Sequence, residues 1–354
     1  PWIVRPLFLK RGDKEIVIED GVEIRAKAGE YQGLVDTLLS VSGAKNVTIR
    51  GEGSAAIVMN KKDYQDATRY KHSEWRHTLA IRDGARNVSV SNLTLRASGG
   101  DGVYVLHADG IRLENVKFLD HHRQGISVIS GSNLLARNCD FSDTEGTPPA
   151  CGIDFEPNNA RDYLVDCVLD DCEFAGNQYG GVLFHLTTLS TASEPVSVTV
   201  RNCRLTGNAS GLIVTAASNY QPPVKGSVRI ENCEIAGSNG RSATFNGLSA
   251  SSVQVELRNC LLASKVTDIP DILLSNSDFS EDFAGLRFTD TVLRTANATP
   301  VSFLAAAGAG FASVDGTLTV ERNGGSFDFD FSAFAAANVI AKILKVCAVR
   351  VSDP

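Results

Sequence analysis

The feature that most constrains the fold of this chain is a unit that repeats along the sequence. Each copy consists of an Asn or Asp, a short apolar segment, a polar turn, a Gly and a second short apolar segment. A constant local frame with insertions of variable length is typical of a solenoid. The polar column consists of Asn92, Asn115, Asn138, Asp171, Asn202, Asn232 and Asn259, and the Gly column of Gly102, Gly125, Gly152, Gly181 and Gly211.

The length of the unit favours a coil of three short strands. The shortest copies span 23 residues, which is too few for a repeat of paired helices, and no segment has a 3.6-residue apolar period. At a tight corner Asn tolerates a left-handed backbone, and its amide can bond the next Asn along the stack. We therefore predict an all-β chain that forms a parallel β-helix, with coils stacked about 4.8 Å apart.

The repeats resemble those of the pectate-lyase-like superfold. The resemblance covers residues 40–265 and rests on units such as NVSVSNLTLRASGGDGVYV and RNCRLTGNASGLIV. It implies a right-handed helix and a polysaccharide or oligosaccharide partner. The superfold includes polygalacturonase-like hydrolases, polysaccharide lyases, alginate epimerases and phage tailspikes, so it does not by itself name the reaction. Relatives occur as monomers and as trimers, and we expect a monomer or a homotrimer here.

Three regions divide the chain. We expect an N-terminal cap and first coil over residues 1–40, the β-helix over residues 41–265, and terminal coils with a C-terminal cap over residues 266–354. Within the last region, the Asn-Gly-Gly turn of TLTVERNGGSFDFDF predicts a hairpin. The run FSAFAAANVIAKILKVCAV is expected to form a helix followed by a strand.

The overall charge and the N-terminus restrict partners and location. A net charge of −7 argues against a nucleic-acid partner, which would require a basic stripe. No stretch approaches the roughly 18 to 20 apolar residues of a membrane helix. Residue 1 is Pro rather than an initiator Met, which fits a removed signal peptide. We therefore expect a secreted bacterial protein that is extracellular or periplasmic.

The cysteines predict a packing column rather than disulfides. Five of the eight cysteines stand in the same four-residue motif of successive repeats. The motif consists of an Asn or Asp, the Cys, any residue and an apolar residue. One Cys in the same place of each coil is typical of a buried stack of small side chains. No CxxC or zinc-type Cys/His spacing is present, so we expect no metal centre. The column consists of Cys139, Cys172, Cys203, Cys233 and Cys260.

Strand alternation predicts which side chains leave the core. In the strand after each Gly, the first and third residues are apolar and point inward, so the middle and flanking residues point outward. Polar residues concentrate in these outward positions only around residues 101, 124 and 154. Three outward columns follow: His77, Asp101, Gln124, Cys151, Gly180 and Ser210; Ala80, Tyr104, Ser127, Asp154, Leu183 and Ile213; and Arg82, Leu106, Ile129, Glu156, His185 and Thr215.

Asp154 and Glu156 are the first candidates for catalysis. They lie two residues apart on one strand, which places their Cβ atoms about 6 to 7 Å apart on the same side. Carboxyl groups about 6.5 to 9.5 Å apart are typical of inverting glycosidases. We predict Asp120 and His122, in the turn DHHRQ one coil earlier, as further catalytic groups, because His exchanges protons near neutral pH.

Further residues around these acids are predicted to bind the substrate. His121, Arg123 and Gln124 belong to the same turn, and Arg can clamp an anionic group bidentately. Asp101, Tyr104 and His185 extend the patch to the neighbouring coils, and Asn158 stands in the loop after Glu156. The insert NKKDYQDATRYKHSEWRH supplies Trp75, Arg76 and His77, with Tyr64 and Tyr70 as further rings that could stack on sugars.

Three functions remain open from the sequence. The first is a glycoside hydrolase that uses the two carboxylates and no cofactor. The second is a polysaccharide lyase or uronate epimerase that uses Tyr104, His121, His122 and Arg123, in which the acidic pair could hold Ca²⁺. The third is a non-catalytic adhesin or tailspike-type module that only binds glycans.

Overall fold

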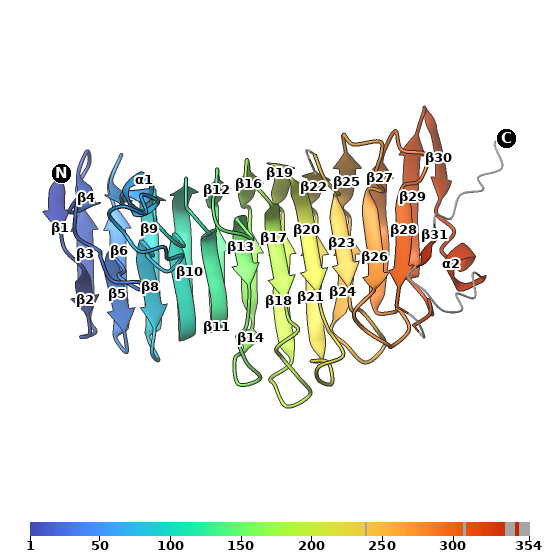
Figure 1. Ribbon diagram of the computed structural model, residues 1–354, viewed down its shortest axis with the longest axis horizontal. Coiled ribbons are helices and arrows are strands. Elements are labelled where there is room, and N and C mark those ends of the chain that lie inside the picture. The colour runs from blue at the N-terminus through green and yellow to red at the C-terminus, as the bar shows by residue number, and fades with distance from the viewer. Residues whose placement is uncertain (238, 307–308, 337–343, 347–354) are drawn as a thin grey trace.

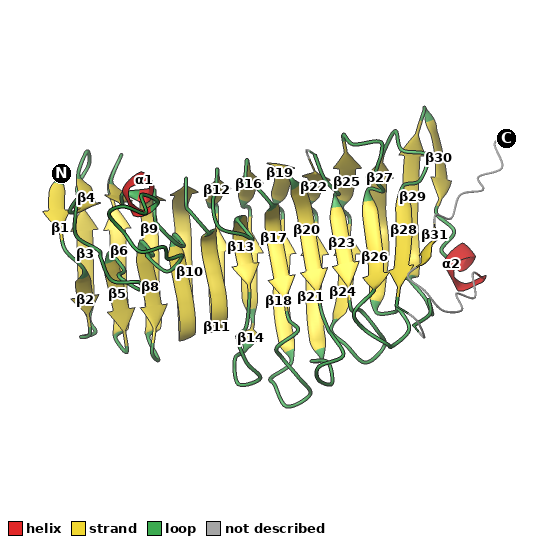
Figure 2. Cartoon of the chain, in the orientation of Figure 1, coloured by secondary structure: helices red, strands yellow, loops and turns green. Residues whose placement is uncertain are grey.

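The chain forms one long stack of β-coils that runs from residue 2 to residue 322 (Figure 1). The computed structural model describes residues 1–237, 239–306, 309–336 and 344–346. Nearly all its regular structure is strand (Figure 2), and all strand pairs are parallel except β28–β31 and β29–β30. The predicted parallel β-helix is confirmed. No helix within the described ranges is long and apolar enough to cross a membrane.

Each coil contributes to three parallel sheets, and a few long strands bend from one sheet into the next. The site sheet contains β2 (Leu7–Leu9), β5 (Leu39–Ser42), β8 (Leu79–Arg82), the starts of β10 (Val103–Leu119) and β11 (Gln124–Arg137), β13 (Cys151–Phe155), β17 (Gly180–His185), β20 (Ser210–Thr215), β23 (Ala243–Asn246), β26 (Ile272–Asn276) and β28 (Val301–Ala305).

The second sheet contains β3 (Lys14–Ile18), β6 (Lys45–Gly51), the start of β9 (Arg86–Arg96), later parts of β10 and β11, β14 (Leu164–Val165), β15 (Cys167–Asp170), β18 (Val196–Arg201), β21 (Gly226–Glu231), β24 (Gln254–Arg258) and the starts of β27 (Leu286–Arg294) and β29 (Asp315–Arg322).

The third sheet contains β1 (Trp2–Val4), β4 (Glu23–Ala26), β7 (Ala56–Val58), the ends of β9 and β10, β12 (Asp140–Ser142), β16 (Glu173–Ala175), β19 (Arg204–Asn208), β22 (Glu234–Gly237), β25 (Leu261–Ser264), the ends of β27 and β29, and β30 (Gly325–Asp328).

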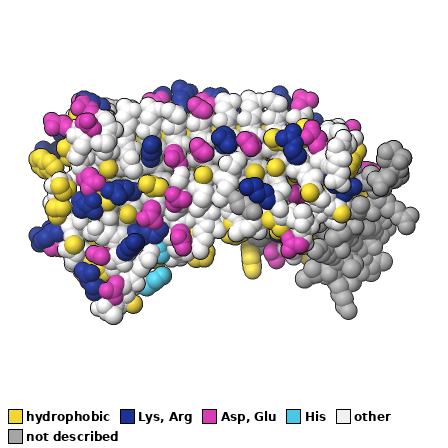
Figure 3. Space-filling view, turned by 90° about the horizontal axis from the view of Figure 1, so that it is seen from above, with side chains coloured by type: hydrophobic (Ala, Val, Ile, Leu, Met, Phe, Trp, Pro, Cys, Tyr) yellow, Lys and Arg dark blue, Asp and Glu magenta, His cyan; other side chains and the backbone are white. Residues whose placement is uncertain are grey.

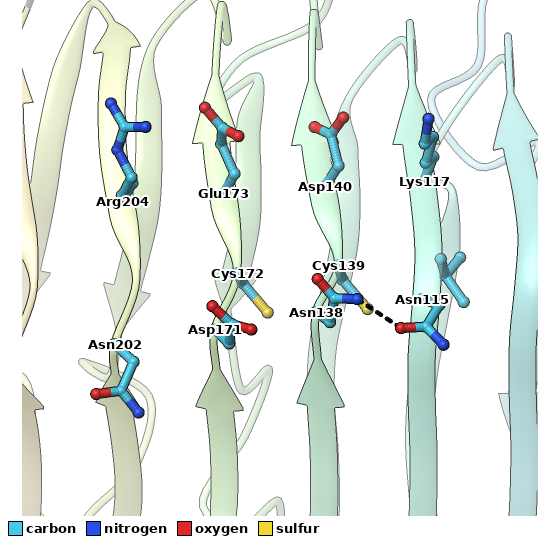
Figure 4. A pocket seen from close by; sticks show the side chains of 11 residues that line it. Asn115, Lys117, Asn138, Cys139, Asp140, Asp171, Cys172, Glu173, Asn202 and Arg204 are labelled. Atoms are coloured by element: carbon cyan, nitrogen blue, oxygen red, sulfur yellow. Dashed lines mark hydrogen bonds between the residues drawn. The ribbon is translucent and has the colours of Figure 1, made fainter.

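The corner between the second and third sheets is built by the predicted Asn column. All its members have a left-handed backbone, with φ between 50° and 56°. The Asn138 Nδ2 donates to the Asn115 Oδ1 at 2.6 Å, which Figure 4 shows, and the Asn115 Nδ2 donates to the Asn92 Oδ1 at 2.9 Å. The ladder breaks at Asp171 because a carboxylate cannot donate, and the Asn202 amide bonds the Asp170 carboxylate instead. The ladder therefore fixes the register of successive coils.

The core is filled by stacked columns of identical side chains. Phe118, Phe141 and Phe174 stack nearly parallel, with 4.6 Å between successive ring centroids. The five cysteines of the predicted column are buried and free, as are Cys151 and Cys167. The prediction of a packing column is thereby confirmed, while Cys347 lies outside the described residues.

Both ends of the described solenoid are made of coils. Residues 1–18 already form a complete coil, since β1, β2 and β3 pair with β4, β5 and β6, and the described part of residues 1–40 contains no separate capping element. Apolar side chains are exposed there, among them Trp2 at 71% and Phe8 at 62%, and Figure 3 shows hydrophobic atoms at this tip. At the other end, coils continue past residue 265 to β29, in the region for which terminal coils were predicted.

The predicted hairpin is confirmed by the antiparallel pair β29–β30. The predicted helix and strand after it are represented by α2 (Ser332–Ala336) and β31 (Leu344–Val346), and the rest of that run lies outside the described residues. The helix α1 (Lys61–Tyr64) belongs to the long insert that lies in front of the N-terminal strands in Figure 1.

Asp271 makes the stability of the fold depend on pH. The carboxyl is fully buried and accepts one hydrogen bond, from the Thr295 Oγ1 at 2.8 Å. Burial raises the pKa of Asp271 to about 6, so this residue favours folding most at low pH, and that contribution is lost as the pH rises from about 4 through 6. We expect the free energy of unfolding of the wild type to fall by about 1 to 3 kcal/mol between pH 4 and pH 8 because of this carboxyl. Asp271→Asn should remove this part of the pH dependence.

Urea unfolding of both proteins at pH 4 and pH 8 measures this difference. Asp268→Asn, at an exposed position three residues away, is the matched control and should keep the wild-type pH dependence. An Asp271→Asn protein whose stability changes with pH as much as that of the wild type would contradict the assignment.

Candidate active site

A cavity of about 470 Å³ lies on the outer side of the site sheet, over β8, β10, β11 and β13. One wall comes from the long insert before β8. In Figure 3 the visible histidines gather in the N-terminal half of the molecule, beside mixed Asp, Glu, Lys and Arg side chains. The cavity is lined by Val35, Thr37, Glu74, Trp75, His77, Arg82, Tyr104, Arg123, Ile129, Glu156 and Asn158.

Strand register brings the predicted outward columns together. Tyr104 pairs with Ser127, and Ser127 pairs with Asp154 on the next strand. Val103 and Val105, which stand on either side of Tyr104 in the strand, are buried in the core, as alternation requires. The expected exposure is wrong for part of the column, since the side chains of Ser127 and Asp154 are fully buried. Neighbouring side chains cover these positions, so an outward direction does not by itself give access to solvent.

Arg123 is the centre of the charge arrangement. Its Nη2 lies 2.7 Å from the Glu156 Oε2, its Nη1 lies 3.8 Å from the Asp101 Oδ1, and its Nε lies 4.0 Å from the Glu74 Oε2. Nη1 also donates to the Ser127 Oγ at 3.3 Å. Burial alone would lower the pKa of Arg123, but Asp101 and Glu156 outweigh burial and raise it. Every nitrogen of this guanidinium therefore faces a carboxylate of the protein itself.

Asp154 is held beneath this group. The Gln124 Nε2 donates to its Oδ2 at 3.0 Å, and the Cys151 N–H donates to the Gln124 Oε1 at 2.8 Å, which fixes the orientation of the amide. The Asp154 Oδ1 has no hydrogen-bond partner among the described residues. Burial and then the nearby Glu156 raise the pKa of Asp154 well above its usual range, against the opposing effect of Arg123. This environment favours the protonated carboxyl.

His77 and Tyr104 form the aromatic part of the cavity. Their rings stack 4.8 Å apart with an angle of 11°. The His77 Nδ1 lies 3.2 Å from the Asp101 Oδ2 and 3.1 Å from the Asp101 backbone N–H, and only one of these contacts is a hydrogen bond for a given tautomer. Burial and then Asp101 raise the pKa of Tyr104. Buried Asp101 thus orients an imidazole that lines the cavity.

Arg76, predicted to bind substrate, is instead a buried tether of the insert. Its guanidinium carbon lies 5.6 Å from the ring centroid of Tyr64 and 5.5 Å from that of Tyr70. Its Nε donates to the Tyr31 carbonyl at 2.9 Å and its Nη2 to the Lys71 carbonyl at 3.0 Å. Tyr64 and Tyr70 are therefore buried around the Arg76 guanidinium, whereas Trp75, at 45% exposure, lines the cavity.

The other candidates of the turn DHHRQ lie away from the cavity. The Asp120 carboxylate pairs with the Lys61 Nζ at 2.6 Å. His121 is fully buried with its Nδ1 2.8 Å from the Ser98 Oγ, and burial, then Lys61, lower its pKa to about 3. The ring nitrogens of His122 contact Gln65 and Thr147. Consecutive residues of a turn point in different directions, so only Arg123 enters the cavity lining.

His185 is also outside the cavity. Its Nε2 lies 2.9 Å from the Thr187 Oγ1, and its side chain is exposed. Five cavity residues, in contrast, were not predicted as site residues, and two of them, Glu74 and Arg82, are charged. Glu74 could have been found from its position directly before Trp75, and Arg82 from its place in the third outward column. Among the described residues, no group of three or more His, Cys, Asp or Glu side chains is arranged to hold a metal ion.

Comparisons with known proteins support the architecture. The model of the family described as "Right handed beta helix region" matches residues 39–222. No curated protein sequence matches the chain. A surface adhesin of Streptococcus pneumoniae, PfbA, has a similar structure, with a TM-score of 0.56 and 13% identity over 92% of this chain and 84% of that one.

Two enzymes are among the other similar structures. The A-module of the mannuronan C-5 epimerase AlgE6 of Azotobacter vinelandii has a TM-score of 0.51 and 14% identity, over 90% of this chain and 79% of that one. An exopolygalacturonase of Thermotoga maritima has a TM-score of 0.48 and 12% identity, over 92% and 83%. At 13% and 14% identity, the likeness to the adhesin and to the epimerase module shows the fold alone, and function has to be argued from the cavity.

Proposed function

The chain belongs to the family of right-handed β-helix proteins, and on that premise we propose that it is a carbohydrate-active enzyme, a glycoside hydrolase that acts in the cavity over β8 to β13. The observation that carries this proposal is the arrangement of its acids. Glu74 and Glu156 line the cavity as carboxylates on two sides of Arg123, while Asp154 beneath them favours the protonated form. Glycosidic hydrolysis requires such a division between a carboxyl proton donor and a carboxylate.

The proposal assigns different roles to Asp154 and Glu156. Asp154 favours its protonated form, whereas Glu156 pairs with the Arg123 guanidinium at 2.7 Å, and carboxyl groups in such different environments can divide the roles of acid and base. Glu156 lines the cavity as the carboxylate that acts on water or on the sugar, and Asp154 stores the proton for the leaving oxygen. Because Asp154 has no exposed surface, the proposal requires the Arg123–Glu156 pair to open when sugar hydroxyls compete for Glu156.

A uronate epimerase or lyase is the second candidate, and one specific observation favours it. His77 is held against buried Asp101 and stacks on Tyr104, so an imidazole and a phenol lie together in the cavity lining. Such a pair can remove a proton from a sugar carbon and return one. This chemistry also requires a cation for the substrate carboxylate. Arg123 is already surrounded by three carboxylates of the protein, which places this candidate after hydrolysis.

Product analysis on a panel of neutral, amino-bearing and uronic-acid polysaccharides tests the proposal. We expect at least one polymer to gain new reducing ends without unsaturated products. Unsaturated products that absorb in the ultraviolet would identify a lyase, and a changed ratio of epimers without chain cleavage would identify an epimerase. Binding without any product would identify a binding module, the role that its name gives to the similar adhesin. Each of these three outcomes contradicts hydrolysis.

A further inference from the structure

The charge of the cavity bears on the kind of sugar that fits it. We propose that the cavity selects a glycan residue that carries a free amino group and that it rejects uronic acids. This inference rests on the proposed function in one respect, since it takes the same cavity as the glycan site. It concerns the substrate class, which neither the reaction type nor the fold determines.

The first argument is the excess of carboxyl groups over available cations. Glu74 and Glu156 line the cavity, and Asp101 and Asp154 lie fully buried beside them. All three nitrogens of Arg123 already face carboxylates of this set. With Asp154 protonated, three carboxylates remain for one guanidinium. A uronate carboxylate would therefore enter next to like charges, which disfavours its binding.

Two further charged groups near the cavity do not reverse this balance. Arg82 lines the cavity, but its Nε lies 3.5 Å from the carboxylate of its neighbour Asp83. Asp162 is buried close enough to Tyr104 to raise the pKa of that phenol, but its carboxylate already contacts the His107 Nε2 at 2.9 Å and accepts from the backbone N–H groups of Asn158 and Asn159. The charges around the cavity therefore favour a ligand that is neutral or positive.

The second argument is a shortage of hydrogen-bond donors. In the described part of the chain, the Oδ1 of buried Asp101 has no hydrogen-bond partner, and its Oδ2 has one only when His77 carries a proton on Nδ1, 3.2 Å away. The 3.8 Å contact from Arg123 to Asp101 is too long for a hydrogen bond. A buried acceptor without a donor costs about 1 to 3 kcal/mol. An ammonium group supplies three donors and a positive charge, whereas a carboxylate supplies only acceptors.

The third argument is the aromatic lining. Trp75 is half exposed in the cavity, whereas one face of the Tyr104 ring is covered by His77, so the open aromatic face is that of Trp75. The faces of Trp and Tyr attract cations, with Trp the most effective ring. The carboxylates, the unmet Asp101 acceptor and the Trp75 ring together form a combination that recognises an ammonium group rather than a carboxylate.

An array of oligosaccharides tests the inference independently of turnover. It should carry amino sugars, their N-acetylated counterparts, neutral sugars and uronic acids, each in several linkages. The probe is Asp154→Asn, in which the amide replaces a carboxyl that already favours its uncharged form, so the charge of the cavity is kept while the proposed proton donor is lost. We expect the variant to bind free amino sugars with a Kd about tenfold lower than that for the N-acetylated forms, a difference of about 1.4 kcal/mol in binding free energy. Added salt should weaken this preference.

Two variants of equal charge change separate the cavity from the net charge of the protein. Glu74→Gln removes a carboxylate of the cavity and should reduce the amino-sugar preference at least threefold. Glu173→Gln removes an exposed carboxylate from the cleft of Figure 4, on the third sheet, and should leave the preference unchanged. An equal loss of preference in both variants would show that overall charge, rather than the cavity, selects the sugar and would overturn the inference.

The outcomes for the inference and for the proposed hydrolase are distinguishable. Selective retention of uronic acids, or of no amino sugar on the array, overturns the inference. If the wild type hydrolyses neutral glycans while the array shows no amino-sugar preference, the hydrolase stands and the inference fails. If amino sugars are retained while the wild type forms no product from them, the inference stands and the hydrolase fails.

Discussion

Glu156→Gln is expected to lower the turnover number for glycan cleavage by about 100- to 10,000-fold, the range that a positioned proton-transferring group contributes. The reason is that glutamine keeps the shape of the side chain and can still accept from the Arg123 Nη2, which lies 2.7 Å from Oε2, but it cannot accept a proton from water. Initial rates of reducing-end formation, measured over a range of substrate concentrations, separate this loss from a change in KM.

Glu173→Gln is the matched control for this experiment. Glu173 begins β16 on the third sheet, away from the cavity, and carries the same formal charge. Its replacement should change the rate less than twofold. A Glu156→Gln enzyme that keeps a third or more of the wild-type turnover would refute the role of Glu156 and would direct attention to His77 and Tyr104.

The second large effect is expected on stability. Arg123→Met should lower the free energy of unfolding at pH 8 by about 3 to 5 kcal/mol, because removing one partner of a buried ion pair leaves the other partners uncompensated. The partners here are Asp101, which is fully buried, and Glu156 and Glu74 at the cavity wall. Urea unfolding followed by circular dichroism measures the change.

Two features make this prediction specific to the charge arrangement. The destabilisation should be smaller at pH 4.5 than at pH 8, since protonation discharges carboxyl groups that have lost their cation. Arg123→Lys keeps the charge but not the planar fork, so it should lose less stability than the Met variant while still losing activity.

The control is Arg204→Met on the third sheet. Arg204 forms an exposed pair with Glu234 at 3.4 Å, and such pairs contribute about 0 to 1 kcal/mol. Arg123→Met and Arg204→Met could lower the free energy of unfolding equally, or the effect of Arg123→Met could be independent of pH. Either result would contradict the assignment of Arg123 as a cation paired with the carboxylates of Asp101, Glu156 and Glu74.

Much of the fold followed from the sequence because it depends on local and repeated chemistry. The left-handed corner at Asn115 and the free, buried Cys139 each need only their own coil and the identical coil beside it. Strand alternation likewise placed Tyr104, Ser127 and Asp154 in one column, which the register confirms. A cap within residues 1–40 stays a prediction, because a cap has no repeating neighbour from which its structure could be inferred.

The composition of the cavity was only partly predictable. Six of the predicted site residues line it, Trp75, His77, Tyr104, Arg123, Glu156 and Asn158. Asp154 belongs to the same cluster but lies buried beneath the lining, and Asp120, His122 and His185 point elsewhere. Period-two alternation fixes direction within a strand, but it says nothing about turns, in which successive side chains diverge.

The sequence by itself therefore determined the coil, its corner ladder and the face that carries the polar residues. Only the tertiary structure decided which of them meet. The insert has to fold around the buried Arg76 to bring Glu74, Trp75 and His77 to the cavity. The charge of Arg123 is balanced only when the chain brings the carboxylates of Glu74 and Glu156 next to it. Both depend on contacts between residues far apart in the chain, because burial and electrostatic interaction are set by distance in space rather than by position in a repeat.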